Sequence, residues 1–412
     1  MPPGRRGPRS LKRELPRSRS RRSDSIRVVL FGAGAMGTVA ARHLVRLKEI
    51  NDLVIADLVP VRARALAAAL RSLKARAVPL RDPAPGGLAQ VLRDADLAIN
   101  AAHADLDLPL MDACLEAGSN YMDLSSEPSK QLPYDTRFRN AGLTALMGGG
   151  EDPGIGNVFA RRGVDALDTV DAIRIRDGDT ASASDTPLPV VWSPETFLVE
   201  VFSPGLVFED GKLIRPPPWS GRETYPFPEP VGPQPVYLMD HEEPETLGRF
   251  IGKGLRYADL KLAIDDATYH VLRTIHDLGL LRDEPLNVEG TRVSPRKLLM
   301  SLVRRPADLV GRVTGTAMIV VEVDGSKDGE RVSQRLYTGM RHEDAARRHN
   351  ATATGYLVGT GAAVFATQFV RGQIAEKGVI SAECLDPAES LRLMGRMGLR
   401  VAHETQTATP LN

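Results

Sequence analysis

The feature that most constrains this chain is a glycine-rich turn, GAGAMG, set between an apolar strand pattern and an amphipathic helix pattern. The strand is RVVLF at residues 27–31, and the helix runs through AARHLVRLKE at 40–49. A second apolar strand, LVIAD at 53–57, follows and ends in Asp57. In such a turn the first glycine permits a tight bend, the second lets the backbone approach a pyrophosphate, and the third lets the helix pack on the strand. The segment therefore predicts a dinucleotide-binding βαβ unit.

The same unit predicts which residues hold the cofactor. Unpaired N–H groups and the dipole at the start of a helix favour a pyrophosphate there. A carboxylate at the end of the second strand can accept hydrogen bonds from ribose hydroxyls but repels a 2′-phosphate, so Asp57 favours NAD. Arg62 and Arg64 follow closely and could pair with a phosphate, which leaves NADP possible. The expected cofactor-binding residues are Gly32, Gly34, Ala35, Met36, Gly37, Asp57, Asn100 and Ala101.

Alternating strand and helix patterns continue to residue 148, which predicts an α/β fold with an N-terminal Rossmann domain, a doubly wound parallel sheet. Further on, TGTAMIVVEV and VSQRLYTGM flank two turn dipeptides, Asp324-Gly325 and Asp328-Gly329. They indicate a β-hairpin and a second α/β domain with a mostly antiparallel sheet. An apolar segment at 355–378, interrupted by Arg371 and Glu376, is expected to be a buried helix at a close interface. The expected divisions are a disordered basic tail (1–25), the Rossmann domain (26–150), a substrate and dimerisation domain (151–345), and C-terminal helices packing back on the Rossmann domain (346–412).

Composition limits the partners and the compartment. A formal net charge of +1 gives no sign of a nucleic-acid partner. No apolar run is long enough to span a bilayer, so no membrane association is expected. Cys114 and Cys384 form neither a disulfide framework nor a metal motif, which favours a cytoplasmic protein without a metal. Residues 1–25 are rich in Arg, Pro and Ser, which predicts disorder, with binding to an anionic surface as the alternative.

The stretch GGGEDPGIGN at residues 148–157 places two carboxylates, Glu151 and Asp152, in a glycine-rich bend. It follows the strand pattern TALMG directly, so the bend is expected at the carboxyl edge of the sheet, where ligands bind in such folds. The side chains that follow other strands should reach the same edge, namely Asn100, His103 and Asp123. The alternatives are an N-cap role for Asp152, a backbone-paired strand-end acid at Asp123, and a solvated loop residue at His103.

Taken in order, the motifs of residues 26–405 resemble the saccharopine dehydrogenase (glutamate-forming) and L-lysine 6-dehydrogenase family. The motifs are VVLFGAGAMG, AINAAHADLDLPLMDACLEAGSNYMDLSS, GGGEDPGIGN, VVWSPETFLVEVFSPGLVFEDGKL, KGLRYADL, VVEVDGSKDGERV and ATATGYLVGTGAAVFATQFVRGQIAEKGVI. The resemblance implies a Rossmann domain interrupted by a second α/β domain, with C-terminal helices that fold back. It also implies NAD(P)-dependent hydride transfer at a carbon that bears nitrogen, and a homodimer formed through the second domain.

The resemblance leaves the substrate open between several readings. The first is oxidative deamination of L-lysine or a similar small amine. The alternative is reductive C–N coupling, of the saccharopine reductase or carboxynorspermidine dehydrogenase type, and a non-catalytic nucleotide sensor is a third class. HEEPETLGRFI at 241–251 departs from the Ser/Thr-rich substrate loop of lysine dehydrogenases, whereas DTPLPVVWSPE at 185–195 is closer to saccharopine reductases.

The chemistry indicates what the site residues must do. A hydride leaves a carbon readily only when the adjacent nitrogen carries a lone pair, so the site must bind an ammonium group and help remove a proton. A carboxylate can bind the cation, and one with a raised pKa can accept the proton. The expected catalytic residues are Asp152, Asp123 and His103, and the expected substrate-binding residues are Arg256, Tyr257 and Trp192.

Each substrate-binding prediction has a structural alternative. Arg256 could hold a substrate carboxylate and Tyr257 could donate a hydrogen bond, or the pair could belong to an ordinary strand with a surface ion pair. Trp192 could line the pocket or pack in the core. His241 and Glu242 stand too isolated in the sequence to suggest a role.

Overall fold

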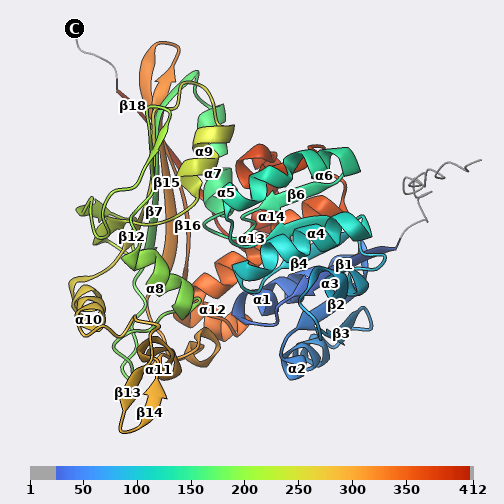
Figure 1. Cartoon of the computed structure of the whole chain (residues 1–412). Coiled ribbons are helices and arrows are strands. Elements are labelled where there is room, and N and C mark those ends of the chain that lie inside the picture. Colours follow the sequence, from blue (N-terminus) through green and yellow to red (C-terminus); the bar gives the residue numbers. More distant parts are fainter. Residues whose placement is uncertain (1–24, 409–412) are drawn as a thin grey trace, which may run out of the picture.

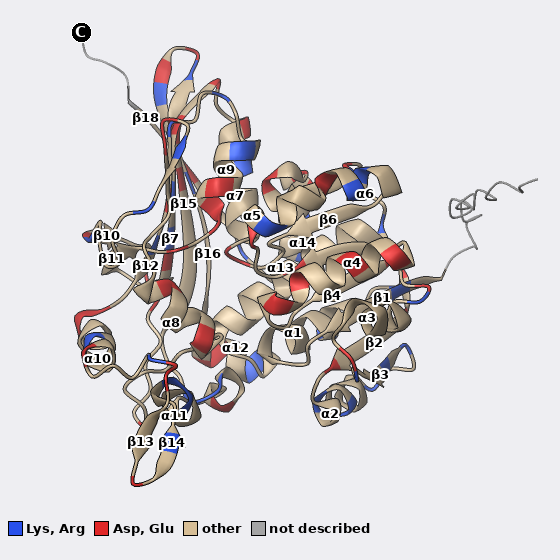
Figure 2. Ribbon diagram, viewed as in Figure 1, with Lys and Arg blue, Asp and Glu red and all other residues tan. Residues whose placement is uncertain are grey.

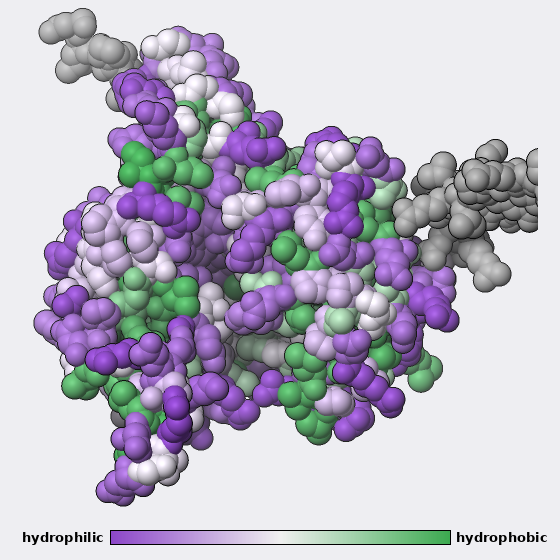
Figure 3. All heavy atoms as spheres, in the orientation of Figure 1, coloured by the Kyte–Doolittle hydropathy of each residue, from purple (hydrophilic) through white to green (hydrophobic). Residues whose placement is uncertain are grey.

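The structure is a computed structural model that describes residues 25–408 (Figure 1). The basic tail predicted for residues 1–25 therefore lies outside the described residues, apart from its last position. Figure 1 shows two parts of the molecule side by side. One is a Rossmann-type sheet covered by helices on both of its faces, and the other is a taller twisted sheet. Figure 3 shows that the molecular surface is hollowed between these two parts on the face in view.

The first sheet has seven strands, all parallel, in the order β17-β6-β5-β4-β1-β2-β3. Its central strands are short, mostly apolar and largely buried, because helices cover both faces of the sheet. The strands are β1 (Ile26–Phe31), β2 (Ile50–Asp57), β3 (Ala75–Pro79), β4 (Leu97–Asn100), β5 (Asn120–Asp123), β6 (Thr144–Met147) and β17 (Gly378–Ser381). The predicted α/β class with an N-terminal Rossmann sheet is confirmed.

Helices connect these strands and cover the sheet. They are α1 (Ala35–Leu44), α2 (Pro60–Leu70), α3 (Pro85–Val91), α4 (Asp107–Ala117), α5 (Pro128–Gln131) and α6 (Asp135–Ala141), with short 3₁₀ turns at Ala104–Leu106 and Leu132–Tyr134. Three of them begin with a proline in the first turn, where its missing N–H costs no hydrogen bond.

The second sheet is mixed and mostly antiparallel, as predicted, with β7 and β12 as its one parallel pair among the described strands. The main order is β10-β11-β12-β7-β15-β16-β18, and β8 and β9 extend from β12. The strands are β7 (Thr169–Asp179), β8 (Val207–Glu209), β9 (Lys212–Ile214), β10 (Glu223–Pro226), β11 (Pro233–Leu238), β12 (Tyr257–Ala263), β15 (Thr316–Lys327), β16 (Glu330–Arg341) and β18 (Ala402–Ala408). A separate hairpin joins β13 (Leu286–Val288) and β14 (Thr291–Val293).

The predicted β-hairpin is formed by β15 and β16, but only one of its two turn dipeptides makes the turn. Asp328 and Gly329 have φ values of 52° and 82° and connect the strands. Gly325 instead lies inside β15, at a register shift opposite β7. A Cβ there would lie 2.0 Å from the Thr169 carbonyl oxygen, so this glycine permits a close approach of two strands.

The remaining helices belong to the second domain and the C-terminal segment. They are α7 (Ile155–Asp165), α8 (Pro194–Phe202), α9 (Glu243–Phe250), α10 (Asp266–Asp277), α11 (Pro295–Leu302), α12 (His342–His349), α13 (Ala353–Val370) and α14 (Pro387–Arg396), with 3₁₀ turns at Pro306–Leu309 and Ala382–Cys384. The segment 346–412 was expected to be helical, yet it also supplies β17 to the first sheet and β18 to the second. These two strands were not predicted from the sequence, because their residue patterns are no clearer than those of the helices around them.

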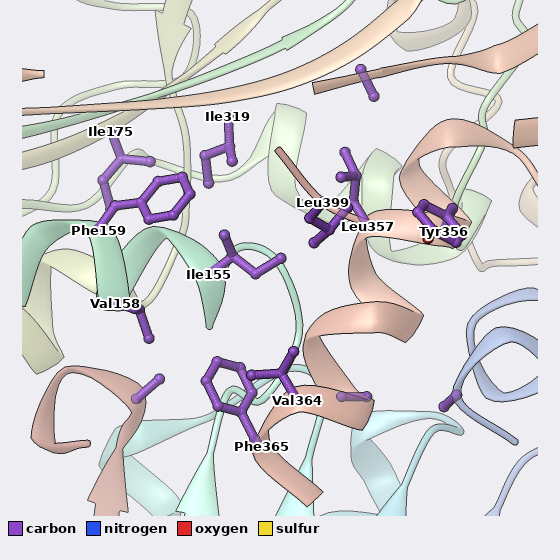
Figure 4. Close-up of a cluster of buried hydrophobic side chains, with 14 of the residues drawn as sticks. Ile155, Val158, Phe159, Ile175, Ile319, Tyr356, Leu357, Val364, Phe365 and Leu399 are labelled. Carbon is purple, nitrogen blue, oxygen red and sulfur yellow. The ribbon is translucent and has the colours of Figure 1, made fainter. Parts of the chain in front are cut away.

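The predicted buried helix is α13, which lies between the two sheets. It ends at Val370, eight residues before the expected end, and β17 begins at Gly378. Fourteen of its 18 residues are buried. Figure 4 shows Leu357, Val364 and Phe365 of α13 in a cluster with apolar side chains of α7, β7 and β15. No helix within residues 25–408 has the length and apolar character needed to cross a bilayer.

Candidate active site

The glycine turn after β1 forms the predicted cradle for a dinucleotide. A Cβ on Gly32 would lie 2.4 Å from the Ala101 carbonyl oxygen, and one on Gly37 would lie 2.2 Å from that of Gly32. A Cβ on Gly34 would meet nothing within 4 Å, so open space lies in front of the start of α1. No side chain caps that helix start and no acid lies in its first turn. The geometry therefore suits a pyrophosphate held by the backbone N–H groups of Ala35, Met36 and Gly37.

Asp57 closes one side of this cradle. One oxygen of its carboxylate accepts a hydrogen bond from the Ala33 N–H at 2.8 Å, and the other accepts from the Val59 N–H at 2.7 Å. The side chain is 9% exposed. Asp57 thus ties the glycine turn to the end of β2 and keeps lone pairs available for a ribose hydroxyl.

The residues after β4 shape the edge of the cradle without all facing a ligand. The Asn100 amide is buried, donates to the Asp107 carboxylate at 2.6 Å and accepts from the Ala102 N–H at 3.0 Å. Ala101 packs against Gly32 and Gly37. The His103 imidazole is mostly exposed, and its Nδ1 accepts a hydrogen bond from the Asp105 N–H. His103 therefore lies at the sheet edge as a capping residue.

Asp123 holds the bend at residues 148–150 in place. Its Oδ1 accepts a hydrogen bond from the Gly148 N–H at 2.6 Å, and its carbonyl accepts from the Gly149 N–H at 2.7 Å. Its Oδ2 accepts from Tyr121 and Gln131. Burial, and then the neighbouring carboxylate of Asp107, raise the pKa of Asp123 well above its usual value. The geometry matches the alternative weighed for this residue, a backbone-paired acid that positions the next loop.

Close backbone packing explains the glycines of the bend at residues 148–157. A Cβ on Gly154 would lie 2.3 Å from the Gly150 carbonyl oxygen, and one on Gly361 of α13 would lie 2.1 Å from that same atom. The backbone is folded on itself and pressed against α13, which only glycine allows at these points. Helix α7 begins at Ile155 with Gly154 as its N-cap, so the alternative N-cap role for Asp152 is wrong.

Asp152 belongs to a group of titratable side chains that we call the acidic cluster. Its members come from the bend, from the end of β7, from α8 and from the start of α9, whose acidic first turn is visible in Figure 2. They influence one another's ionisation, and they are Glu151, Asp152, Asp177, Asp179, Glu200, His241, Glu242 and Glu243. Only one of the eight is a base.

Two members of the acidic cluster titrate near neutrality. Burial raises the pKa of Asp152 to about 7, with the charges of Glu243 and Glu200 adding to the rise and His241 opposing it. Burial likewise raises the pKa of Glu200 to about 8, against the opposing charge of His241. A carboxyl in this range can give or take a proton at physiological pH, as acid–base catalysis requires.

The pKa values of two further members, Asp177 and His241, are also raised. Burial, and then Asp152 and Asp179, raise the pKa of Asp177 well above its usual value. For His241, burial favours the neutral ring, but the charges of Glu243 and Glu242 outweigh it and raise the pKa well above its usual value. The imidazolium and Glu243 form a hydrogen bond of 2.5 Å between Nδ1 and Oε2.

Ligand atoms of His241, Glu242 and Glu243 lie within 4.8 Å of one another, so the three could also hold a metal ion. Their hydrogen bonds argue for a simpler interpretation. The Nδ1 of His241 is bound to Glu243, and an oxygen of Glu242 accepts two hydrogen bonds from Ser126. An ion pair anchored to the neighbouring sheet accounts for the arrangement.

Hydrogen bonds also fix Asp179, the last residue of β7. Its carboxylate accepts from the His342 imidazole at 3.1 Å and from the Thr354 hydroxyl at 2.8 Å. His342 is the first residue of α12, and Thr354 lies in the first turn of α13. The cluster is thus held by both the second sheet and the C-terminal helices.

The structure brings one of the three predicted substrate-binding residues to this region. Trp192 lines a small pocket together with Asp179 and packs edge-on against Phe197, with ring centroids 5.2 Å apart. Arg256 is 71% exposed and pairs with Asp210.

The Tyr257 hydroxyl donates to Asp259 at 3.0 Å. Tyr257 pairs with Ala172, five residues before Asp177 on β7, which places it roughly 16 Å away along the strand. Arg256 and Tyr257 therefore lie at the opposite end of β7 from the acidic cluster.

Sequence reasoning missed most of this cluster. Asp177 and Asp179 lie two apart on β7 and therefore share a face, which the alternation of the strand could have revealed. Glu200 lies on α8 with no local mark of function. The run His241-Glu242-Glu243 was visible, but its meaning depends on partners from three other elements.

A dinucleotide cradle at the edge of a Rossmann sheet, facing carboxyls that titrate near neutral pH, is the arrangement of an NAD(P)-dependent dehydrogenase. Comparison with known proteins narrows this class. Residues 28–146 match the saccharopine dehydrogenase NADP binding domain, and residues 150–400 match the saccharopine dehydrogenase C-terminal domain. The chain belongs to the saccharopine dehydrogenase family, as its motifs predicted, and is an NAD(P)-dependent dehydrogenase of that family.

Individual relatives agree with this assignment. The chain is 30% identical over 388 residues to a carboxyaminopropylagmatine dehydrogenase from Synechocystis, covering 90% of this chain and 96% of the relative. It is 29% identical over 403 residues to a carboxynorspermidine synthase from Vibrio alginolyticus, covering 90% and 95%. In fold it is similar to saccharopine dehydrogenase (L-Glu forming) from Saccharomyces cerevisiae, with a TM-score of 0.70, 15% identity, and coverage of 92% of this chain and all of the other.

Proposed function

We propose that this dehydrogenase catalyses reductive C–N coupling, joining the primary amine of a polycationic substrate to an aldehyde to give a secondary amine. The observation that supports this proposal best is the acidic cluster, in which seven carboxyls are grouped with His241. The names of the two relatives, which refer to a carboxylated norspermidine and a carboxylated aminopropyl agmatine, favour the same chemistry. Reductive C–N coupling is the function that the sequence left open as the alternative to oxidative deamination of L-lysine.

Charge distinguishes a polyamine from lysine. Several carboxyls in a partly buried site attract a molecule with two or more ammonium groups, because each added positive charge relieves their mutual repulsion. Lysine has a net charge of only about +1, because its α-carboxylate offsets one of its two ammonium groups, so it relieves this repulsion less than a polyamine does unless a cation of the protein pairs with that carboxylate. Arg256, the cation expected for that task, lies away from the cluster.

The reaction requires proton transfers that the cluster can provide. The substrate ammonium must lose a proton before its nitrogen attacks the aldehyde carbon. The resulting carbinolamine loses water, and the C=N bond then gains a hydride at carbon and a proton at nitrogen, which leaves a secondary amine and oxidised cofactor. The reduced nicotinamide, when bound, supplies the hydride. We assign the proton transfers to Asp152 and Glu200, whose pKa values of about 7 and 8 suit both directions.

We assign stabilisation of the positive charge on the iminium nitrogen to carboxylates of the acidic cluster. A fixed negative charge near a developing cation is worth more in a partly buried site than in water. Asp179 on β7 and Glu243 on α9 are held in place for that task by their hydrogen bonds to His342 and His241. Asp123 contributes by holding the bend that carries Asp152, and Trp192 contributes an apolar wall beside Asp179.

We propose that the cofactor is NAD(H), with Asp57 as the residue that disfavours a 2′-phosphate. The carboxylate is held rigidly by two backbone N–H groups at the ribose end of the cradle. Arg62 and Arg64 follow on α2 and are exposed, so they supply the residual affinity for NADP(H).

The proposed coupling is tested in the oxidative direction by near-ultraviolet absorbance of the reduced nicotinamide. Purified protein is mixed with carboxynorspermidine, carboxyaminopropylagmatine, saccharopine or L-lysine, each with NAD or NADP. Formation of reduced cofactor with a carboxylated polyamine, at least about tenfold faster than with lysine or saccharopine, supports the proposal. Turnover of lysine in preference to all others would overturn it in favour of oxidative deamination.

We further propose a homodimer formed through the second domain. The β13–β14 hairpin projects from the body of the molecule beside α10 and α11 (Figure 1). This region exposes an unusual set of large apolar side chains, Leu278, Leu286, Val288, Leu298 and Leu302. A patch of this kind favours a protein partner, and a second copy is the simplest one. Light scattering should give a dimer for the natural protein and a monomer for the Leu298→Glu, Leu302→Glu variant, whereas a natural monomer would refute the proposal.

A further inference from the structure

A second pocket, distinct from the cofactor cradle, opens between the ends of α1, α12 and α14 and the flank of α13. Its volume is about 570 Å³, within the range of ligand-binding pockets. Basic side chains dominate its lining, and they are Arg42, His43, Arg46, Arg347, Arg348, His349, Arg371 and Arg396. Figure 2 shows the basic residues at the end of α12. We call this the arginine pocket.

The arginine pocket is separate from the site of the dinucleotide. The cradle lies at the first residue of α1, whereas the pocket is lined by the C-terminal half of that helix. At 1.5 Å per residue, Arg42 of the pocket lies about 10 Å along α1 from Ala35 at the cradle. The pocket is therefore no extension of the pyrophosphate or ribose sites.

Its positive charge exceeds what the protein itself neutralises. Six arginines line it, and ion pairs join Arg347 to Asp344 and Arg371 to Glu49. The C-terminal ends of four helices, α1, α12, α13 and α14, point basic side chains into it, and each helix end carries about half a negative charge. Together the two acids and the four helix ends compensate about four of the six charges, which leaves roughly two uncompensated.

Contacts within the arginine pocket show that its positive charges repel one another. The Arg42 guanidinium donates to the carbonyls of His349 and Asn350 at the end of α12. Burial, and then the charge of Arg46, lower the pKa of Arg42. Like charges held in one cavity destabilise a protein unless a ligand of opposite charge occupies it.

Aromatic rings form one wall of the pocket. The His349 ring stacks on Tyr356 with centroids 4.0 Å apart, and the His43 ring lies tilted to Tyr356 with centroids 6.0 Å apart. Burial, and then Arg46, lower the pKa of His43 to about 4, so its ring is neutral at physiological pH. The wall thus offers ring faces and neutral N–H donors beside the guanidinium groups.

We propose that the arginine pocket binds a small phosphorylated anion carrying about two negative charges. Arginine recognises phosphate by paired N–H···O contacts, and a charge of minus two matches the uncompensated excess. Arg46, Arg348 and Arg396 have exposed side chains and no ion pair among the described residues, so they are the first contacts for the ligand.

The test is isothermal titration of the full chain, with saturating NADH present so that the dinucleotide cradle is occupied. Inorganic phosphate, pyrophosphate and a nucleoside monophosphate are the probes, and they separate free phosphate from phosphate on an organic group. The variant Arg46→Gln, Arg348→Gln removes two pocket charges. The matched control Arg93→Gln, Arg292→Gln makes the same charge change at two exposed residues outside the pocket.

We expect one site for at least one of the probes, with affinity reduced about tenfold or more in the pocket variant and unchanged in the control. Without anion, the pocket variant should unfold at the same or a slightly higher temperature than the natural protein and the control, because two like charges are removed. Arg396→Gln provides a second pocket variant if the double change unfolds the chain. The proposal is overturned by no binding of any probe, or by equal losses in the pocket variant and the control. Binding of an RNA oligonucleotide that none of the small anions displaces would also overturn it.

Discussion

Ser126 and Glu242 join the two parts of the site. The backbone N–H and the hydroxyl of Ser126 both donate to Glu242 Oε1, at 2.7 and 3.1 Å. Ser126 follows β5 of the nucleotide-binding sheet, and Glu242 immediately precedes α9 of the second domain. This contact brings Glu242 of the acidic cluster close to the end of β5, at the carboxyl edge of the nucleotide-binding sheet.

The first prediction concerns the charge of Glu242. Glutamine at this position keeps the size of the side chain and can still accept from Ser126, but it removes one negative charge. Glu242→Gln should therefore raise KM for a cationic amine about tenfold, with a smaller change in kcat, because a hydrogen bond or contact to a charged group is worth about 1.5–3 kcal/mol. Steady-state kinetics measure this. Glu195→Gln, on the exposed first turn of α8, is the control, and an unchanged KM in Glu242→Gln would contradict the prediction.

The second prediction concerns pH and Asp152. The pKa of this carboxyl is raised to about 7, so it is protonated below that pH and ionised above it. If Asp152 donates the proton in the coupling direction, it sets the alkaline limb of the profile, and kcat/KM should fall above about pH 7. Asp152→Asn should remove this limb and lower the rate by about 10² to 10⁴.

A pH–rate profile of Glu200→Gln serves as the comparison. The pKa of Glu200 is raised to about 8, so a limb near pH 8 that disappears only in this variant would assign the proton to Glu200 instead. If the limb survives in both variants, neither Asp152 nor Glu200 is the proton donor.

The third prediction concerns the choice of cofactor. Asp57→Ala removes the carboxylate that would repel a 2′-phosphate and leaves Arg62 and Arg64 in place. The ratio of kcat/KM for NADPH to that for NADH should therefore rise about tenfold or more. Asp52, which ends no strand and pairs with Arg76 on the neighbouring strand, supplies the control Asp52→Ala. A ratio that stays constant in Asp57→Ala would show that another residue selects the cofactor.

The nucleotide half of the site was predictable because its signals are local. The roles of Gly32, Gly37 and Asp57 depend on a strand, a turn and a helix within about 30 residues, and each role has its own residue type. The bend at residues 148–157 was placed correctly for the same reason, since it follows a strand directly. Asp123 was found at the right edge, although its hydrogen bonds show a positioning task.

The acidic cluster was not predictable in the same way. Glu200, His241 and Asp177 lie on three separate elements, and they meet only through the register of β7 with β12 and the placement of α8 and α9. Nothing within ten residues of any of them specifies the others. Arg256 and Tyr257 illustrate the converse, because alternation along a strand indicates a face but never which end of the strand meets the ligand.

The fourth prediction concerns stability. The pKa of Asp177 is well above its usual value because of burial and the nearby Asp152 and Asp179. A carboxyl that binds its proton more tightly when folded favours the folded state at low pH, and this contribution is lost as pH rises toward the folded pKa. Asp177→Asn should therefore raise the free energy of unfolding at about pH 8 and change it little at about pH 4, while weakening amine binding. Urea unfolding measures this, with the exposed Asp105→Asn as control. Equal effects at both pH values would refute the account.

The last prediction concerns the contact between α13 and the acidic bend. A Cβ at Gly361 would lie 2.1 Å from the Gly150 carbonyl oxygen, and both positions are buried. Because the obstructing atom belongs to the backbone, Gly361→Ala must move the bend that carries Asp152, which should cost about 1–3 kcal/mol of stability and most of the activity.

Gly395, near the end of α14, provides the matched control because a Cβ there meets nothing within 4 Å. Gly395→Ala removes a glycine from a helix without a clash, so it should stabilise the protein by about 0.4–1 kcal/mol and leave the activity unchanged. Chemical denaturation and the coupling assay measure both variants. If Gly361→Ala behaved like Gly395→Ala, the bend would have room to move, and the close packing of α13 would not be what positions Asp152.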